Sequence, residues 1–313
     1  MTATPHGTHD QLVALIREAQ RSPQEQVYFV PNPGNAGDAL ITAAAYQVFD
    51  KGGFRVRPVH LSRFDPRDKL IVYNGGGNLI NVHTHSYRTI RALHRQARHL
   101  ILLPHTVTSV DPLLDELGSN VTIVAREAVT YDYVRSRRGQ HRTLLMHDLV
   151  FELDVAALLA RNTSAVPYWL PLHFAVNKAL SLYPHCSLST LPRALLRRGL
   201  PGDANQSVAN YFRTDGESRG TPVPADNVDI SEYFMLERAP RGVVDLSAQR
   251  FIRAITGRER IRTDRLHVTI AAAILGKPVE FFPNNYFKCA AVFEHSIRDR
   301  YASVKWMGDA PAA

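Results

Sequence analysis

The chain has 313 residues, with 37 Lys and Arg against 29 Asp and Glu, which gives a formal charge of +8. Hydrophobic residues make up 45% of it and charged residues 21%, a balance that is typical of a folded globular protein and excludes wholesale disorder. A chain of this length usually forms more than one hydrophobic core, so we expect two domains.

The first half of the chain alternates short apolar runs with helical patterns. Runs such as QVYFV and KLIVY are short and bounded by turn residues, as strands of a buried sheet are. The predicted helices cover residues 10–20, 38–49 and 86–98, and the predicted strands cover 26–30, 54–60, 69–73, 100–103, 121–125 and 144–146. This alternation predicts a parallel sheet with helices on both faces.

The same alternation returns in the last third of the chain. There the predicted strands are 207–212, 260–262 and 278–282, and the predicted helices are 247–256, 265–275 and 295–300. The stretch between the two halves is rich in proline and lacks a regular pattern, which indicates a linker or lid-like segment. We therefore expect one α/β domain over residues 1–160, an irregular segment over 161–204 and a second α/β domain over 205–313.

Cysteine content and the N-terminal sequence bear on the cellular compartment. Cys186 and Cys289 are too few for a disulfide-stapled scaffold or a Cys-rich zinc motif. The N-terminal residues lack the basic and apolar regions of a signal peptide, and no apolar run approaches the roughly 20 residues that span a membrane. These features predict a cytoplasmic protein.

Residues that follow the predicted strands carry the most unusual chemistry, and ligands of open α/β sheets bind beyond the carboxyl ends of the strands. After the first strand, Gly34 and Gly37 allow a ligand close to the backbone, and the next helix points its N-terminus at the same place. Asp38 is interpreted either as the cap of that helix or as a free carboxylate at the ligand.

Three further strand ends of the first half are candidates for ligand contact. Three consecutive glycines at 75–77 indicate a close approach of the backbone to a ligand, although they match neither a Walker P-loop nor GxGxxG. His105 follows the fourth strand, where a hydrogen-bonded structural role is the plainer interpretation. Arg126 follows the fifth strand, and it either faces an anionic ligand or forms a buried ion pair with Glu127 or Asp148.

The most specific local pattern lies before the helix predicted at 265–275. Thr263 or Asp264 is a natural N-cap for this helix. Arg265 and His267 are then expected in its first turn, where backbone N–H groups and the helix dipole favour an anion. This pattern predicts a phosphate site.

A second charged pattern follows the first strand of the second half. Arg213, Asp215 and Glu217 place one guanidinium and two carboxylates near the expected ligand. The alternative interpretation is a solvated turn.

Taken together, these segments resemble the polysaccharide pyruvyl transferase family. The segments that carry the resemblance, in chain order, are GNAGD (34–38), NGGGNL (74–79), LLPHT (102–106), AREAVTYDYV (125–134), HDLVFEL (147–153), FRTDGE (212–217) and TDRLHVTIAAAILGKPVEFFPNNYFK (263–288). Arg265-Leu266-His267 is the strongest of them. The family often has Gln where this chain has His105, and residues 155–205 match nothing in it.

The resemblance implies a GT-B-like fold, in which two Rossmann-like domains face a cleft. It also implies phosphoenolpyruvate as donor and a sugar diol as acceptor, on a glycan or a lipid-linked oligosaccharide. The products would be a cyclic pyruvate ketal and phosphate, with a role in exopolysaccharide or cell-surface glycan biosynthesis. No metal and no further cofactor is demanded, because arginines can neutralise the phosphate.

The chemistry of this transfer assigns expected roles to the residues singled out above. Phosphoenolpyruvate is close to trianionic, so its site needs cations and oriented N–H donors. The expected donor-binding residues are Arg126, Arg213, Arg265, Asn35, Gly37, Gly76, Gly77, Asn78 and His105. His267 is the first candidate for the acid, and the candidates for the base are Asp38, Asp215 and Glu217.

Three other functions remain open at this point. A nucleotide-sugar glycosyltransferase of the same fold would use a carboxylate on the donor ribose, for which Asp226, Asp229 and Glu232 are available. A non-catalytic sugar-binding protein is a second alternative, and nucleic-acid binding through basic patches is a third. No aromatic-rich RNA-binding motif appears, so we expect no nucleic-acid partner.

Two further features have both a purely structural and a functional interpretation. Arginines recur at helical spacing in the segment 86–100, which is either a solvated helix face or a peripheral contact with the inner face of an anionic membrane. Tyr168 and Trp169, flanked by prolines, are either packed aromatics or a platform for the acceptor sugar.

Overall fold

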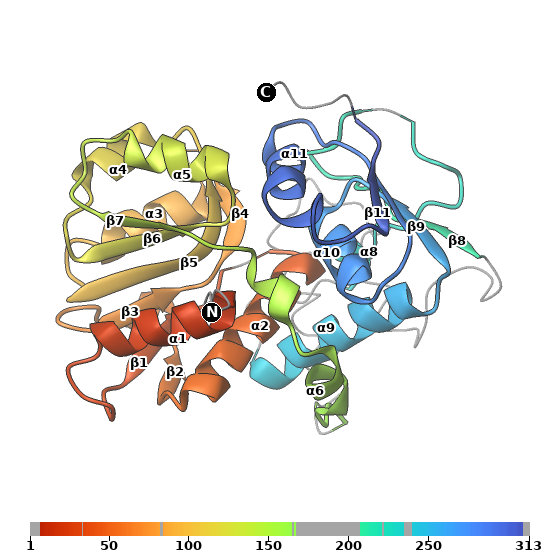
Figure 1. The fold of residues 1–313 in the computed structure, drawn as a ribbon. Coiled ribbons are helices and arrows are strands. Elements are labelled where there is room, and N and C mark those ends of the chain that lie inside the picture. The colour runs from red at the N-terminus through yellow and green to blue at the C-terminus, as the bar shows by residue number, and fades with distance from the viewer. Residues whose placement is uncertain are drawn as a thin grey trace, which may run out of the picture. The chain divides into compact units, whose positions relative to one another are not determined.

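The computed structural model describes residues 7–32, 34–81, 84–164, 166, 207–220, 222–234 and 240–308. The chain divides into two compact units. Unit 1 comprises Met1–Asn32 and Ala44–Leu153, and unit 2 comprises Pro33–Ala43 and Asp154–Ala313. Each unit contains one parallel sheet with helices packed on it (Figure 1). The chain is therefore an α/β protein whose two sheets are consistent with two Rossmann-like domains.

The sheet of unit 1 has seven strands among the described residues, and every pairing in it is parallel. The strands are β1 (Val27–Val30), β2 (Val56–Pro58), β3 (Leu70–Tyr73), β4 (Gly76–Leu79), β5 (His99–Val107), β6 (Val121–Ala125) and β7 (Arg142–Leu145). Their order is β2-β1-β3-β5-β6-β7, and β4 pairs with β5 beside β3. The parallel sheet predicted from the apolar runs is confirmed.

Helices cover both faces of this sheet (Figure 1). The helical elements are α1 (Thr8–Ala19), the main part of α2 (Ala36–Gly52), η1 (Leu61–Arg63), α3 (His85–Leu93), α4 (Asp111–Glu116), α5 (Ala128–Arg135) and η2 (Leu149–Glu152). Alternate strand residues such as Ile71 and Leu102 form one core with Ile90 of α3 and helices α4 and α5. On the other face, Phe29 packs edge-on against Phe49 of α2. Successive side chains of each strand point to opposite faces of the sheet, so each strand contributes to two hydrophobic layers.

Unit 2 contains a four-stranded parallel sheet within its described residues, in the order β11-β10-β9-β8. Its strands are β8 (Val208–Asn210), β9 (Arg260–Thr263), β10 (Val279–Phe281) and β11 (Val304–Trp306). Its helical elements are α6 (Val155–Ala160), α8 (Ile230–Tyr233), α9 (Arg241–Thr256), α10 (Leu266–Ile274), α11 (Lys288–Val292) and the π-helix η5 (Phe293–Ile297), with the first turns of α2. Helix α10 is apolar on nearly all sides and is buried accordingly.

The glycine-rich segment after β3 departs from its predicted form. Gly76–Leu79 is a strand that pairs with the second half of β5, with Gly76 opposite His105. Strand β5 therefore continues to Val107, and His105 lies within it instead of beyond its end. Glycine composition argued against a strand here, but pairing with a neighbouring strand outweighs that local preference.

Smaller differences concern the limits of elements. Helix α9 begins at Arg241, six residues before the predicted start, and the helix predicted at 295–300 is the π-helix at Phe293–Ile297. Strand β11 was not predicted. The segment 161–204, with Tyr168 and Trp169, lies almost entirely outside the described residues, so the domain boundaries stay predictions.

The basic segment 86–100 has acidic partners within unit 1. Helix α3 ends at Leu93, before two of the arginines in question. Arg95 pairs with Glu116 at 2.7 Å, and Arg98 pairs with Glu25 at 2.6 Å. The helix predicted over 86–98 is therefore shorter than expected, and Arg95 and Arg98 form their ion pairs beyond its end. The membrane contact stays a prediction. Across the described ranges, no helix combines the length and hydropathy needed to cross a membrane.

Candidate active site

The N-terminus of α2 is closed by its own side chains. The Asn35 side-chain oxygen accepts a hydrogen bond from the Gly37 N–H at 2.8 Å, and the Asp38 carboxylate accepts one from the Asn35 N–H at 2.9 Å. This reciprocal arrangement is a capping box, which satisfies backbone donors that the helix itself leaves unpaired. Asp38 therefore caps α2, which is one of the two roles that the sequence suggested for it. Its role as a catalytic base stays a prediction.

The first turn of α2 lies directly against His267 of α10. A Cβ placed on Gly37 would fall 2.8 Å from His267 Nδ1, closer than real Cβ atoms approach other atoms. Only glycine allows this contact without displacing its neighbours. Packing against His267 therefore explains a glycine at position 37 without any ligand. Unit 2 thereby brings Asn35, Gly37 and His267 together from two distant parts of the sequence.

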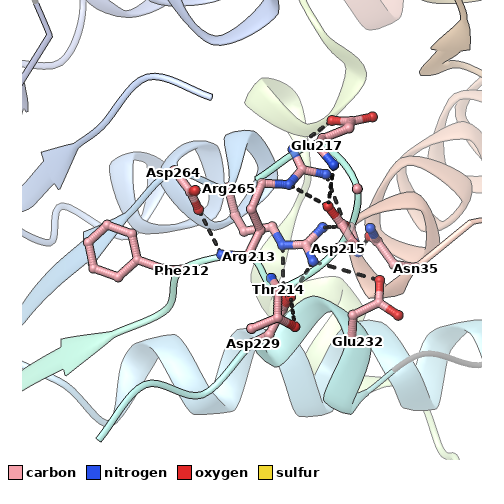
Figure 2. A network of polar contacts seen from close by, with 12 residues as sticks. Asn35, Phe212, Arg213, Thr214, Asp215, Glu217, Asp229, Glu232, Asp264 and Arg265 are labelled. Carbon is pink, nitrogen blue, oxygen red and sulfur yellow. Dashed lines mark hydrogen bonds and ion pairs between the residues drawn. The ribbon is translucent and has the colours of Figure 1, made fainter. Parts of the chain in front are cut away.

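Arg213 binds both carboxylates that were predicted to lie near it. Its Nε and Nη2 donate to the two oxygens of Asp215 at 2.8 and 3.0 Å, and its Nη1 lies 2.6 Å from Glu217 Oε2 (Figure 2). The Arg213 side chain is 6% exposed. The bidentate pairing buries the guanidinium, while the segment itself is a turn in which Asp215 and Glu217 stay 30% and 29% exposed.

Arg265 joins the same cluster from the start of α10 (Figure 2). Its Nη1 lies 2.9 Å from Asp215, and its Nε and Nη2 both donate to the carboxylate of Asp229, which precedes α8. From the segment after β10, Lys288 Nζ donates to Glu217 at 2.7 Å. We call Arg213, Asp215, Glu217, Asp229, Arg265 and Lys288 the ionic cluster.

The start of α10 differs from its prediction in one respect. Arg265 is the N-cap residue and α10 begins at Leu266, so Arg265 precedes the first turn. Thr263 accepts a hydrogen bond from the Arg265 N–H at 3.0 Å, whereas Asp264 accepts one from the Arg213 N–H at 2.8 Å. Asp264 therefore ties the loop after β8 to the loop after β9 and does not cap the helix.

Two carboxylates of the ionic cluster, Asp215 and Glu217, are held in their charged form. Burial by itself raises the pKa of Asp215, but the hydrogen bond from Arg213 and the charge of Arg265 outweigh burial and bring the pKa to about 2. Burial likewise opposes ionisation of Glu217, yet Lys288 and Arg213 lower its pKa. The three cations thus face the carboxylates of Asp215, Glu217 and Asp229, and Arg265 also lies 3.7 Å from Glu232, so the ionic cluster carries no surplus positive charge.

Arg126 of unit 1 forms the buried ion pair that its position suggested. Its Nη1 donates to Asp148 at 2.7 Å and its Nε donates to Thr106 at 2.9 Å, and both charged side chains are 1% exposed. Glu127 instead caps α5 by accepting from the Thr130 N–H at 2.8 Å. The guanidinium of Arg126 is engaged inside unit 1, so a contact with the donor stays a prediction.

His105 is a buried, uncharged group in unit 1. Its Nδ1 lies 2.9 Å from the Leu103 carbonyl oxygen, and its ring stacks on Tyr73 with 5.7 Å between centroids. Burial lowers its pKa to about 4. At neutral pH His105 therefore contributes no positive charge to a phosphate site.

The other predicted donor residues of unit 1 lie in β4. Gly76, Gly77 and Asn78 form the start of this strand. The amide of Asn78 exchanges two hydrogen bonds of 2.8 Å with the amide of Asn32 and accepts a third from Ser86. These contacts give Asn78 a structural role, and its predicted role in donor binding stays a prediction.

Sequence reasoning missed two members of the ionic cluster. Asp229 was considered only as a ribose ligand, and Lys288 was quoted in a motif without a role. One feature of the sequence could have indicated Lys288. It is the single charged residue in a run after a strand that is otherwise apolar or aromatic, and a charge in such a run is often buried and paired.

Comparisons with known proteins agree with these observations. A family model described as Polysaccharide pyruvyl transferase matches residues 35–286. A functionally uncharacterised protein from Klebsiella pneumoniae subsp. pneumoniae has a similar solved structure, with a TM-score of 0.71 and 24% identity over 97% of this chain and 99% of that chain. That likeness concerns the fold alone. No curated protein sequence matches the chain significantly.

The buried histidine makes stability depend on pH. Because the folded pKa of His105 is about 4 and the unfolded one about 6.5, the unfolded chain binds the extra proton. The free energy of unfolding should fall by on the order of 3 kcal/mol as pH drops from 6.5 to 4. In urea denaturation, His105→Gln should weaken this pH dependence, whereas exposed His60→Gln should preserve it. An unchanged pH dependence in His105→Gln would contradict the assignment.

The Arg126–Asp148 pair predicts a large loss of stability when only one partner is removed. Asp148→Ala leaves a buried guanidinium without its carboxylate and should lower the free energy of unfolding by about 3–5 kcal/mol. The double variant Arg126→Met/Asp148→Leu should lose clearly less, because no unpaired charge remains. As a control, Glu18→Ala removes one side of an exposed pair with Arg142 and should change little. Equal effects of Asp148→Ala and Glu18→Ala in urea titration would refute the prediction.

Proposed function

Because the chain belongs to the polysaccharide pyruvyl transferase family, we propose that it transfers pyruvate from phosphoenolpyruvate to two hydroxyl groups of a glycan sugar, forming a cyclic ketal and releasing phosphate. The observation that carries this proposal is the ionic cluster, which gathers Arg213, Arg265 and Lys288 at the carboxyl ends of β8, β9 and β10. Ligands of α/β sheets bind at this edge.

Donor binding in this proposal is an exchange of partners. The cations of the ionic cluster already face as many carboxylates, so a trianionic donor gains nothing from net charge alone. Its phosphate and carboxylate instead replace Asp215 or Glu217 as partners of the guanidinium groups. A planar guanidinium suits this exchange, because it binds any carboxylate or phosphate in the same two-point geometry.

The exchange also prepares a base. A carboxylate with a pKa of about 2 accepts protons poorly at neutral pH, and efficient general bases have a pKa near the working pH. When the donor draws Arg213 or Arg265 away, the pKa of Asp215 rises towards that range. Asp215 or Glu217 can then take the proton of the attacking acceptor hydroxyl.

His267 is the proposed acid. It lies on α10 two residues after Arg265, and histidine is the side chain most often used for proton transfer. It would protonate the methylene carbon of phosphoenolpyruvate while the first acceptor hydroxyl forms a bond to the adjacent carbon. The second hydroxyl then attacks the same carbon and displaces phosphate, which leaves with the proton of that hydroxyl as hydrogen phosphate and so completes the ketal.

The nucleotide-sugar alternative has less support from the carboxylates it needs. Asp229 is buried against Arg265, and the two oxygens of Asp226 accept hydrogen bonds from the Asn210 side chain at 2.9 and 3.0 Å. Glu232 Oε1 lies 3.7 Å from Arg265 Nη2, so all three carboxylates considered for the ribose have partners within unit 2. We place the reaction in the cytoplasm, with a glycan or a lipid-linked oligosaccharide as acceptor, and with contact at the inner face of the membrane as part of the proposal.

A thermal-shift comparison tests the donor. Phosphoenolpyruvate at about 100 times its dissociation constant should stabilise the protein by about 2.7 kcal/mol and raise the melting temperature by a few degrees. UDP and GDP should not. Arg265→Lys should lose the shift because an ammonium lacks the planar pair of N–H donors that binds two oxygens side by side, while Arg262→Lys, outside the ionic cluster, should keep it. A shift with a nucleotide alone would favour the glycosyltransferase.

Turnover tests the acid. His267→Gln should reduce phosphate release from phosphoenolpyruvate by about 10²–10⁴-fold, the usual contribution of proton transfer. Stabilisation by phosphoenolpyruvate should largely persist, because the arginines remain. Turnover close to that of the wild type would rule out His267 as the acid.

A further inference from the structure

The loop between β10 and α11 contains a buried amide that has no hydrogen-bond partner in the described part of the chain. Asn284 is 5% exposed, and neither its side-chain oxygen nor its side-chain nitrogen has a hydrogen-bond partner among the described residues. Its neighbour Asn285 is exposed and donates from its side chain to the Gly216 carbonyl oxygen at 3.3 Å. Buried polar groups in native proteins are nearly always paired, so the unpaired amide of Asn284 needs an explanation.

Hydrogen bonds on both sides of Asn284 place it beside the ionic cluster. The Phe282 N–H donates to the Thr263 carbonyl oxygen at 2.8 Å, which ties the loop to the residue before Asp264. On the other side, the Asn285 N–H donates to the Glu217 carbonyl oxygen at 3.4 Å, and Lys288 donates to the Glu217 carboxylate. Asn284 thus lies between the two loops that carry Arg213 and Arg265.

The chemistry of an amide indicates which ligand suits it. Its nitrogen only donates and its oxygen only accepts. Phosphate and carboxylate groups accept only, so they would satisfy the nitrogen of Asn284 and leave its oxygen facing negative charge. A hydroxyl group both donates and accepts, and a pair of hydroxyls can satisfy both atoms of the amide together.

We infer that Asn284 binds the hydroxyl pair of the acceptor sugar, next to the donor in the ionic cluster. The inference rests on the proposed function, since that reaction joins two sugar hydroxyls to the donor carbon. It assigns the two substrates to different residues: the anionic donor to the arginines, and the neutral diol to a neutral amide.

Asn284→Leu tests this inference, because leucine has a similar volume and no hydrogen-bonding group. Asn284→Ala serves as a second variant where the branched side chain does not fit, and Asn285→Leu is the matched control at an exposed position. The probes are the methyl glycosides of glucose, galactose and mannose, added at high millimolar concentration with phosphoenolpyruvate. The readout is the melting temperature as a function of sugar concentration.

In the wild type, we expect at least one glycoside to add stabilisation. In Asn284→Leu, the sugar concentration for half the effect should rise roughly tenfold or more, the loss expected for a hydrogen-bonded group. Stabilisation by phosphoenolpyruvate should stay as in the wild type, and so should the melting temperature without ligands. Asn285→Leu should resemble the wild type throughout.

Three results would overturn the inference. Equal sugar dependence in Asn284→Leu and the wild type would mean that water alone satisfies the amide. Loss of the phosphoenolpyruvate shift in Asn284→Leu would place the amide on the donor. Absence of any sugar effect on the wild type would remove the evidence for a diol site. Failure of the proposed function looks different, because the wild type would then show no shift with phosphoenolpyruvate, whatever the sugars do.

Discussion

The buried guanidinium of Arg265 is the group on which the arrangement of unit 2 depends. Its side chain is 4% exposed, and a charge at that depth is costly unless carboxylates surround it. Asp215 and Asp229 supply them from the loop after β8 and from the residue before α8. A single residue at the start of α10 thereby holds two other segments at the carboxyl edge of the four-stranded sheet.

This constraint links the stability of unit 2 to its proposed chemistry. Asp215 and Glu217, which stabilise the guanidinium groups, are the same carboxylates proposed to accept a proton, and in that proposal they become basic only when a donor takes their place. Arg126 in unit 1 is as deeply buried and is likewise held by partners of its own unit, Asp148 and Thr106. Its carboxylate partner, Asp148, has no proposed part in the proton transfer.

Local patterns in the sequence predicted the parts of the fold that depend on periodicity. The apolar runs at β1, β3, β5 and β6 are strands because each is bounded by turn residues and can pack on both faces. Gly76–Leu79 could not be predicted in this way, since its strand character comes from hydrogen bonds to β5. Asp264 could not be assigned either. Its position just before α10 suits a helix cap. Its carboxylate instead accepts a hydrogen bond from the backbone N–H of Arg213, which is 51 residues away in the sequence.

The sequence by itself determined two parallel α/β sheets, the family, and the strand ends at which arginines, histidine and carboxylates gather. These features depend on the order and spacing of neighbouring residues, which one chain displays directly. Only the tertiary structure decided which charges neutralise each other, that His105 is uncharged, and that Asn284 is buried with no hydrogen-bond partner among the described residues. Such properties depend on distances between loops and on exclusion of water, because the strength of a charge or a hydrogen bond is set by what surrounds it and not by its position in the chain.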